Sequence, residues 1–245
     1  MEKYKFTGET KTIYLPFGTV TLHRIKAVVE FGLVKVGDLG GWIEKEENLS
    51  HEENAWVCGN ADVYGDAKVC GNADVYGDAK VCGNAWVYDN TWVYDNAWVC
   101  GNAKVCGKAW VCGDAKVYGD AKVCGNSKVC GNAKVCGNAE VCGNAEVCGN
   151  AKVFSADHVL VIGAIGSRND FTTFFRDKDN EITVKCGCFL GKIDKFLEKV
   201  TQTHKDTKHA LVYRAAVEVA KLQIDLTEKV QGDEKVNGKS KIKIY

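Results

Sequence analysis

The chain has 245 residues, and its 32 basic and 32 acidic side chains give a formal net charge of zero. This length suits one large domain or two modest ones, and the neutral total gives no sign of a general attraction to nucleic acid or membranes. No run of 18 apolar residues is present, and the first residues lack the apolar core of a signal peptide. We therefore expect a cytoplasmic protein whose thirteen cysteines are mostly free thiols.

Residues 1–54 are expected to form an N-terminal β cap. Three stretches, at residues 4–7, 12–15 and 20–25, alternate enough to be short strands. Ile43 and Leu49 lie 12 and 6 residues before Ala55, which places them on the alanine position of the repeat that follows. A distorted first coil is therefore expected to begin there. A solenoid needs such a cap because its terminal coil exposes unpaired backbone groups and an apolar interior.

Residues 55–156 carry a six-residue repeat. Valine occupies 17 consecutive positions, in steps of six, from Val57 to Val153. Alanine stands two residues before each valine except at Thr91 and Ser127, and Gly-Asn or Gly-Asp usually follows. Alanine and valine face the same side of an extended strand, while the glycine pair tolerates the positive φ of a turn. The pattern predicts a mainly β protein built on a parallel β-solenoid, with coils about 4.8 Å apart.

This stretch resembles the hexapeptide-repeat family, whose fold is the left-handed β-helix. The resemblance implies triangular coils of 18 residues, so that the hexads make five to six coils. The left hand comes from the resemblance alone, since the usual crossover rule predicts the opposite. The segment Gly37–Glu44, followed by Asn-Leu-Ser and the repeats, is similar to an architecture that recurs in phage and bacterial hexapeptide-repeat proteins. Rods of this family often trimerise through flat faces, so a homotrimer is also implied.

The outward side chains of the rod align in three columns when the sequence is read in steps of 18. The columns hold Trp56, Asp74, Trp92, Trp110, Lys128 and Glu146; then Asp62, Lys80, Trp98, Lys116, Lys134 and Lys152; then Lys68, Trp86, Lys104, Lys122 and Glu140. Exposed Trp and Tyr side chains on a flat sheet often mark a protein interface. Stacking between coils that only stabilises the ladder is the alternative.

Eleven of the thirteen cysteines fall on the position after valine. They stack as Cys112, Cys130 and Cys148 on one face, Cys106, Cys124 and Cys142 on another, and Cys82 and Cys100 on the third. The simplest interpretation is that cysteine packs here as a small, semi-apolar residue. Disulfides between coils are expected to be disfavoured, because Cβ atoms about 4.8 Å apart exceed the usual range. Rows of thiolates can attract Zn²⁺ or Cu(I), but no zinc spacing is present, so neither a metal nor another cofactor is predicted.

Residues 157–226 lose the period and predict a small α+β domain on the open end of the solenoid. Strands are expected at residues 158–162, 171–176 and 181–186, followed by a helix up to His204 that carries Ile193, Phe196, Leu197 and Val200. A second helix is expected near residues 210–226, with an apolar stripe of Leu211, Val212, Ala215, Val219 and Leu222. Residues 227–245 form a charged tail, in which 241–245 can add a strand.

A candidate ligand site lies in this domain. It comprises Ser167, Arg168, Asn169, Asp170, Thr172, Thr173, Cys188 and His204. Arginine can form a bidentate contact with a phosphate or carboxylate, and the hydroxyls can complete an anion site. An anionic small molecule or nucleotide is therefore the ligand that this loop predicts. The alternatives are a well-bonded turn with His204 as a helix-end residue, or a Cys188–His204 nucleophile pair.

The function that needs only these observations is a non-catalytic structural or interaction protein, whose rod binds a partner through its aromatic columns. A binding protein for an anionic ligand is the first alternative. An enzyme is the second, because many hexapeptide-repeat proteins transfer acyl groups with a histidine at a coil edge. The repeat has no histidine between His51 and His158 and no long loop to cover a substrate, which argues against acyl transfer.

Overall fold

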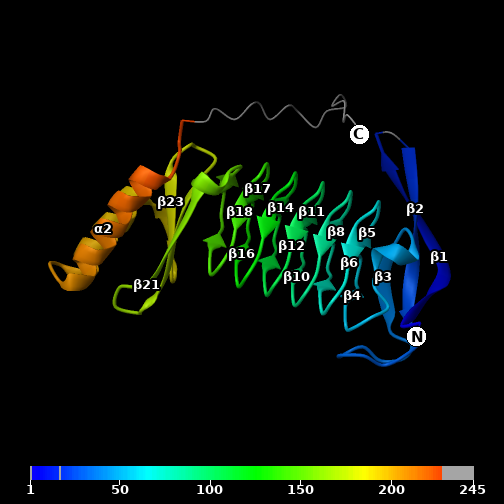
Figure 1. Cartoon of the computed structure of the whole chain (residues 1–245). Helices are drawn as coiled ribbons and strands as arrows, with labels where there is room; N and C mark the ends of the chain where they lie inside the picture. Colours follow the sequence, from blue (N-terminus) through cyan, green and yellow to red (C-terminus); the bar gives the residue numbers. More distant parts are fainter. Residues whose placement is uncertain (1, 17, 228–245) are drawn as a thin grey trace.

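The structure, a computed structural model, describes residues 2–16 and 18–227 and shows a straight rod with a β hairpin at one end and a small α+β unit at the other (Figure 1). One two-residue strand forms in each hexad, and each strand that has a further coil after it pairs in parallel with the strand one coil later, as Trp92 does with Trp110. The repeat therefore folds as the predicted β-solenoid. The strands are β4 (Trp56–Val57), β5 (Asp62–Val63), β6 (Lys68–Val69), β7 (Asp74–Val75), β8 (Lys80–Val81), β9 (Trp86–Val87), β10 (Trp92–Val93), β11 (Trp98–Val99), β12 (Lys104–Val105), β13 (Trp110–Val111), β14 (Lys116–Val117), β15 (Lys122–Val123), β16 (Lys128–Val129), β17 (Lys134–Val135), β18 (Glu140–Val141), β19 (Glu146–Val147) and β20 (Lys152–Val153).

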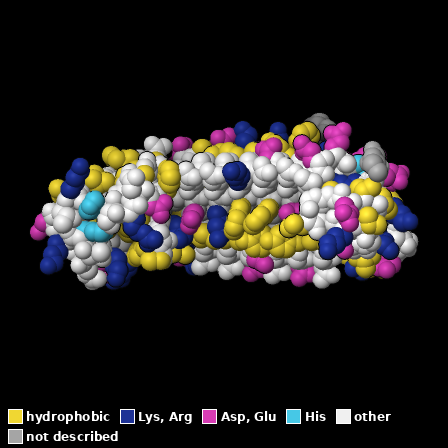
Figure 2. Space-filling view, turned by 90° about the horizontal axis from the view of Figure 1, so that it is seen from below, with side chains coloured by type: hydrophobic (Ala, Val, Ile, Leu, Met, Phe, Trp, Pro, Cys, Tyr) yellow, Lys and Arg dark blue, Asp and Glu magenta, His cyan; other side chains and the backbone are white. Residues whose placement is uncertain are grey.

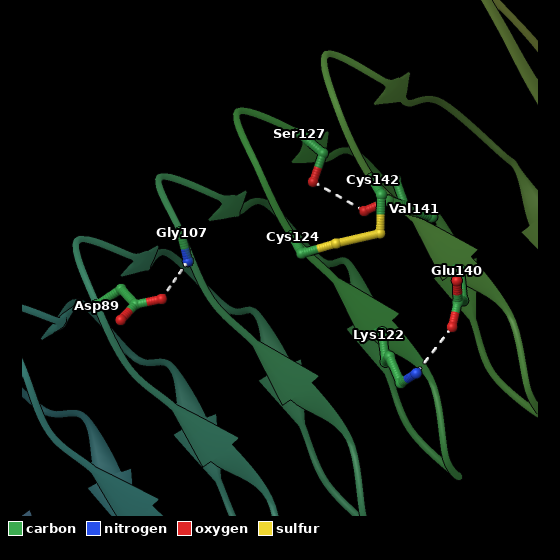
Figure 3. Close-up of a disulfide and its surroundings, with 8 residues drawn as sticks. All are labelled: Asp89, Gly107, Lys122, Cys124, Ser127, Glu140, Val141 and Cys142. Carbon is green, nitrogen blue, oxygen red and sulfur yellow. Dashed lines mark hydrogen bonds and ion pairs between the residues drawn. A yellow bond between two sulfur atoms is a disulfide. The ribbon is translucent and has the colours of Figure 1, made fainter.

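The interior of the rod is filled by the alanines and valines of the repeat. Every repeat valine from Val57 to Val153 is at most 1% exposed. The two polar exceptions are also buried, and each satisfies its hydroxyl locally. Thr91 donates to the Tyr88 carbonyl at 3.1 Å, and Ser127 donates to the Val141 carbonyl at 3.0 Å (Figure 3). Chemistry in the rod is therefore confined to its outer surface.

The corners of the rod need glycine because the backbone has positive φ and the next coil lies close. A Cβ atom on Gly125, at φ +70°, would lie 2.8 Å from the carbonyl oxygen of Gly143. Aspartate replaces glycine at Asp89 and Asp95, and there the carboxylate accepts the N–H of the next coil, as Asp89 does from Gly107 at 2.9 Å (Figure 3).

The N-terminal cap is an antiparallel hairpin that continues one sheet of the rod. Strand β1 (Tyr4–Leu15) pairs with β2 (Gly18–Ala27), which pairs with β3 (Leu39–Ile43), and β3 lies parallel to β5. Two of the expected short strands are thus parts of one continuous β1. A short 3-10 helix, η1 (Glu46–Asn48), follows β3.

A first coil does begin in the cap, but its expected phase was wrong. Ile43 pairs with Val63, and Leu49 bridges Val69, so both stand at the valine position and not at the alanine position. The reason is that Leu49 and Val57 are eight residues apart, two more than a hexad. The extra residues fall in the turns and bends at 50–54, where the N–H groups of both Asn54 and Ala55 reach the Gly71 carbonyl.

The C-terminal unit is a four-stranded antiparallel sheet with two helices on one face (Figure 1). A 3-10 turn, η2 (Ala156–His158), leads into β21 (Val159–Ile165), β22 (Asp170–Arg176), β23 (Ile182–Cys186), β24 (Phe189–Lys192), α1 (Ile193–His204) and α2 (Lys208–Gln223). Phe175 joins the core of the rod, whereas Phe174 packs beneath the helices. The sheet therefore closes the open end of the solenoid, as expected. Strand β24 was not predicted.

The buried face of α2 differs from the predicted stripe. The residues that pack inward are Ala210, Tyr213, Ala216, Val217 and Ala220. Leu211 and Leu222 are 59% and 89% exposed. The small alanines let the helix approach α1 and the sheet closely, and the Tyr213 ring fills the remaining space between them. The strand predicted at residues 241–245 lies outside the described residues.

Candidate functional site

The predicted ligand loop is the exposed turn between β21 and β22. Ser167, Arg168, Asn169 and Asp170 are all exposed there. The guanidinium of Arg168 lies over the neighbouring turn, where a Cβ on Gly187 would be 3.1 Å from Nη1. These four exposed side chains therefore lie at one tip of the sheet, beside the turn that contains Gly187.

Thr172 and Thr173 point to opposite faces of β22. The Thr172 hydroxyl is buried towards the helices and donates to the Cys186 sulfur at 3.2 Å. Thr173 faces the rod, where its oxygen accepts the backbone N–H of Glu146 at 3.0 Å. Because successive side chains of a strand alternate in direction, the two threonines cannot serve one site.

Tyr213 of α2 is the centre of the cluster that contains Thr172. Its hydroxyl lies 3.8 Å from the Cys186 sulfur and leaves no room for a Cβ on Gly166. Burial, with a smaller effect of Cys186, raises the pKa of Tyr213 to about 12. The His204 ring lies against Tyr213, with ring centres 5.7 Å apart. Sequence reasoning missed Tyr213 because its position in α2 gives no sign that it reaches β23.

Cys188 and His204 do not form a nucleophile pair in the described residues. Cys188 is exposed in the β23–β24 turn, and no hydrogen bond joins its thiol to His204. His204 instead contacts the rings of Tyr213 and His209. The structure therefore brings Thr172 and His204 to the Tyr213 cluster, places Arg168 at its edge, and leaves Thr173 and Cys188 apart.

A pocket of about 190 Å³ lies elsewhere, between the last coil and the C-terminal sheet. It is lined by Cys148, Gly149, Asn150, Phe175, Asp177, Asp179, Thr183, Leu190 and Lys192. Its polar groups bond to one another: Lys192 pairs with Asp177 and Glu181, and Thr183 donates to Asp177 at 2.6 Å. Burial would raise the pKa of Asp177, but these hydrogen bonds outweigh it and hold the pKa below its usual range. The carboxylates here do not match the anionic ligand that the sequence predicts.

The cysteine columns correct one expectation. Disulfides join Cys124 to Cys142 (Figure 3) and Cys130 to Cys148, each between successive coils. Their Cα atoms lie 4.6 and 4.7 Å apart, which is within the range that disulfides use. The prediction compared the coil spacing with the Cβ range and overlooked that Cβ atoms of neighbouring coils can lean towards each other.

The third face holds a pair of free thiols beneath the N-terminal hairpin. Cys82 and Cys100 are reduced, and the Trp98 indole N–H donates to the Cys82 sulfur at 3.2 Å. Hydrogen bonds from Cys100, Trp98 and Tyr64 outweigh burial and lower the pKa of Cys82 to about 6. Leu22 of the hairpin packs over Cys82 and Tyr64, so this pair is covered.

Tryptophan side chains in all three outward columns contact the coils above or below them. Trp86 is flanked by the ammonium groups of Lys68 and Lys104, at 5.6 and 5.9 Å from its ring centre. Lys128 lies 5.6 Å from Trp110 and Lys116 5.3 Å from Trp98. Contacts between coils that stabilise the ladder, one of the two interpretations of these residues, are therefore present.

Four rings form a continuous patch on the face of β7, β10 and β13, and we call Tyr76, Trp92, Tyr94 and Trp110 the aromatic patch. Trp92 stacks on Trp110 at 4.7 Å and Tyr76 on Tyr94 at 5.0 Å, and Tyr94 meets Trp110 edge-on. Figure 2 shows hydrophobic side chains gathered at mid-rod on this side of the molecule. Trp92 and Trp110 remain 39% and 36% exposed, so their stacking leaves area for a partner.

Over residues 2–16 and 18–227, no group of three or more His, Cys, Asp or Glu side chains is placed to hold a metal ion. Among the same residues no helix is long and apolar enough to cross a membrane. No protein-family model matches the chain, and no curated protein matches it. The hexapeptide-repeat resemblance therefore rests on the repeat itself.

Proposed function

We propose that this chain is a non-catalytic structural and interaction protein, in which the solenoid is a rigid spacer and the aromatic patch is the surface that a partner contacts. The observation that carries the proposal is the patch itself, with four contiguous rings, two of them exposed tryptophans, at the middle of a straight face. Tryptophan and tyrosine are the residues most enriched at the energetic centres of protein interfaces.

The rod suits a spacer because its interior is filled and its coils are hydrogen-bonded to one another along its length. Alanine and valine, with the buried Thr91 and Ser127, fill the interior, and each coil is hydrogen-bonded to the next along all three faces. Partners held at the two ends, or on one face, would therefore keep a constant separation.

The charges that flank the aromatic patch fit a second copy of this chain. Along the same column, Asp74 lies one coil before Trp92, and Lys128 lies one coil after Trp110. A two-fold axis between Trp92 and Trp110 that sets two rods antiparallel would place Asp74 of each copy opposite Lys128 of the other. Packed sheets cross at roughly 30°, which would carry the bulky ends of the two rods apart.

Both charges are open to such a partner. Within the described residues neither Asp74 nor Lys128 has an ion-pair partner, and burial raises the pKa of Asp74. A cation opposite Asp74 would relieve this cost of desolvation. The family resemblance implies a homotrimer instead, so the oligomeric state discriminates between the two arrangements.

Sedimentation velocity over a range of micromolar concentrations tests the proposal. We expect the wild-type chain to form dimers, and Trp110→Ala to be monomeric. Trp86→Ala is the matched control, because Trp86 is 45% exposed but lies on another face, and this variant should still dimerise.

A charge exchange separates the antiparallel arrangement from other contacts through the same face. Asp74→Lys and Lys128→Asp should each weaken the dimer at least tenfold, and the double variant should recover most of the loss. A wild-type chain that stays monomeric, or a trimer that Trp110→Ala leaves intact, would refute this use of the aromatic patch.

A further inference from the structure

Two cysteine columns of the rod end in the same order of residue types, one tyrosine followed by three cysteines. In one, Tyr88, Cys106, Cys124 and Cys142 follow one another on successive coils. In the other, the order is Tyr94, Cys112, Cys130 and Cys148. In both columns the last two cysteines form a disulfide, while Cys106 and Cys112 are free. Each free thiol therefore stands one coil away from a disulfide.

The free thiol and the bonded one have equivalent positions relative to the middle cysteine. The Cys106 N–H donates to the Val123 carbonyl at 2.9 Å, and the Cys124 N–H donates to the Val141 carbonyl at the same distance. The pairs Val105–Val123 and Val123–Val141 are in register. Backbone geometry therefore gives Cys124 two equivalent neighbours, of which only one is bonded to it.

The disulfide also points along the rod. Figure 3 shows the bond between Cys124 and Cys142 running from one coil to the next, with Gly107 on the coil before Cys124. A thiolate at Cys106 would approach the Cys124 sulfur from the side opposite Cys142. Thiol–disulfide exchange requires this approach, because the attacking, central and leaving sulfurs align in the transition state.

We propose that Cys106 and Cys112 are the nucleophiles of an intramolecular thiol–disulfide exchange that moves each disulfide by one coil. The Cys106 thiolate forms a bond to the Cys124 sulfur, the Cys124–Cys142 bond breaks, and Cys142 leaves as a thiolate that takes up the proton that Cys106 lost. One disulfide and one thiol exist before and after, so no oxidant or reductant is consumed. The second column reacts in the same way, from Cys130–Cys148 to Cys112–Cys130.

A tyrosine hydroxyl lies on the far side of each nucleophile. A hydrogen bond with Cys106, with a smaller effect of burial, raises the pKa of Tyr88 to about 12, so the phenol keeps its proton and can donate it to a thiolate. The pKa of Tyr94, beside Cys112, is likewise raised, by burial and by its hydrogen bond with that thiol. Both columns thus place a neutral hydrogen-bond donor beside the sulfur that attacks as a thiolate.

The exchange determines which coils of the rod the disulfides join. In the structure the two disulfides hold the coil that carries Glu146, and this coil binds the C-terminal sheet through Thr173. After exchange the bonds lie one coil further from that sheet, and no disulfide of these two columns joins the last coil to the coil before it. The position of the bonds would therefore control how firmly the C-terminal unit is seated.

Trypsin places each attacking and each central cysteine in a fragment of its own, which makes the links formed by exchange readable by mass. Cys106 lies in fragment 105–108, Cys112 in 109–116, Cys124 in 123–128 and Cys130 in 129–134, whereas Cys136, Cys142 and Cys148 share fragment 135–152. The full chain is reduced, reoxidised with limiting oxidised glutathione, quenched with acid and N-ethylmaleimide, and digested without reductant. We expect 123–128 linked to 135–152 and also to 105–108, with the equivalent two links of 129–134.

Four variants complete the test. Cys106→Ser should lose the link between 105–108 and 123–128, whereas Cys70→Ser, which lies in the same column beyond Tyr88, should change neither link. Cys142→Ser should still form the Cys106–Cys124 disulfide. Cys124→Ser should form none in this column, because the remaining cysteines are two coils apart. The proposal is overturned if the wild-type chain shows only the links to 135–152, if no column disulfide forms, or if Cys142→Ser leaves Cys106 and Cys124 reduced.

Discussion

The Thr173 hydroxyl oxygen accepts the backbone N–H of Glu146 at 3.0 Å, and this hydrogen bond joins the C-terminal sheet to the last coil of the rod. Lys185 adds an ion pair to the Glu146 carboxylate at 3.1 Å. The coil has no further coil to bond to, so the sheet supplies the partner that the missing coil would have supplied. A residue that the sequence suggests as a ligand contact thus has a structural role.

Replacing Thr173 by valine should loosen this junction. Valine has the same shape but no acceptor, so the Glu146 N–H loses its partner, at a cost of about 1 kcal/mol. Thr173→Ser keeps the oxygen and is the matched control. Hydrogen exchange of the amides in the last coil measures the effect, and equal protection in the two variants would show that the hydrogen bond contributes nothing.

Two corner glycines of one column allow the cost of backbone strain to be measured apart from the cost of crowding the next coil. Gly125 and Gly143 both have φ near +70°, but a Cβ on Gly143 meets nothing within 4 Å, whereas on Gly125 it meets the next coil at 2.8 Å. Gly143→Ala should cost about 1 kcal/mol for the left-handed conformation. Gly125→Ala should cost at least about 1 kcal/mol more, because the neighbouring backbone must shift. Urea unfolding compares them, and similar costs would mean that the coils separate easily.

The buried ammonium of Lys3 predicts an unusual dependence on pH. Lys3 is 2% exposed and donates to the Ala55 carbonyl at 2.8 Å, and burial, partly offset by Glu53, lowers its pKa to about 8. The unfolded chain keeps this proton up to about pH 10.4, so between about pH 8 and pH 10 the unfolded state binds more protons. The stability of the cap should therefore rise with pH in this window and not change below it.

Lys3→Met is the control for this effect, because it removes the titrating group and keeps the apolar stem. Hydrogen exchange in strand β1, corrected for its intrinsic pH dependence, reports the stability of the cap. If the stability of the cap rises equally with pH in wild type and variant between about pH 8 and pH 10, the rise comes from groups other than Lys3.

Arg168→Ala tests the alternative of an anionic ligand. The side chain is exposed at the tip of the β21–β22 turn, so its removal should change the free energy of unfolding by no more than about 0.5 kcal/mol. Native mass spectrometry of the protein as purified from cells shows whether an anionic molecule is retained. A retained mass that the wild type holds and Arg168→Ala loses would favour the binding function over the scaffold.

The sequence alone determines the rod and much of its surface. A period of six with alanine and valine two residues apart determines which side chains face the interior. Glycine, which occurs once in each hexad except where Asp89 and Asp95 replace it, marks the turns. The outward columns follow by counting in steps of 18. The strand register agrees with this count, as for Trp92 and Trp110, and so does the disulfide between Cys124 and Cys142. Helix α1 was also predictable, since Ile193, Phe196 and Val200 recur at helical spacing.

Only the tertiary structure decided the features outside the six-residue repeat. Ile43 and Leu49 change phase because two extra residues precede the repeat, and only pairing with β5 and β6 reveals which position they take. The buried face of α2 depends on which residues fit against α1 and the sheet. Tyr213 is buried there, whereas Leu211 and Leu222 stay exposed. Thr172 and Thr173 face opposite sides of the sheet because successive side chains of a strand alternate in direction. Which of the two faces the rod depends on how β22 packs against the last coil. A local sequence pattern determines contacts that repeat along the rod. A contact that occurs only once depends on how two surfaces distant in the sequence pack together in the folded chain.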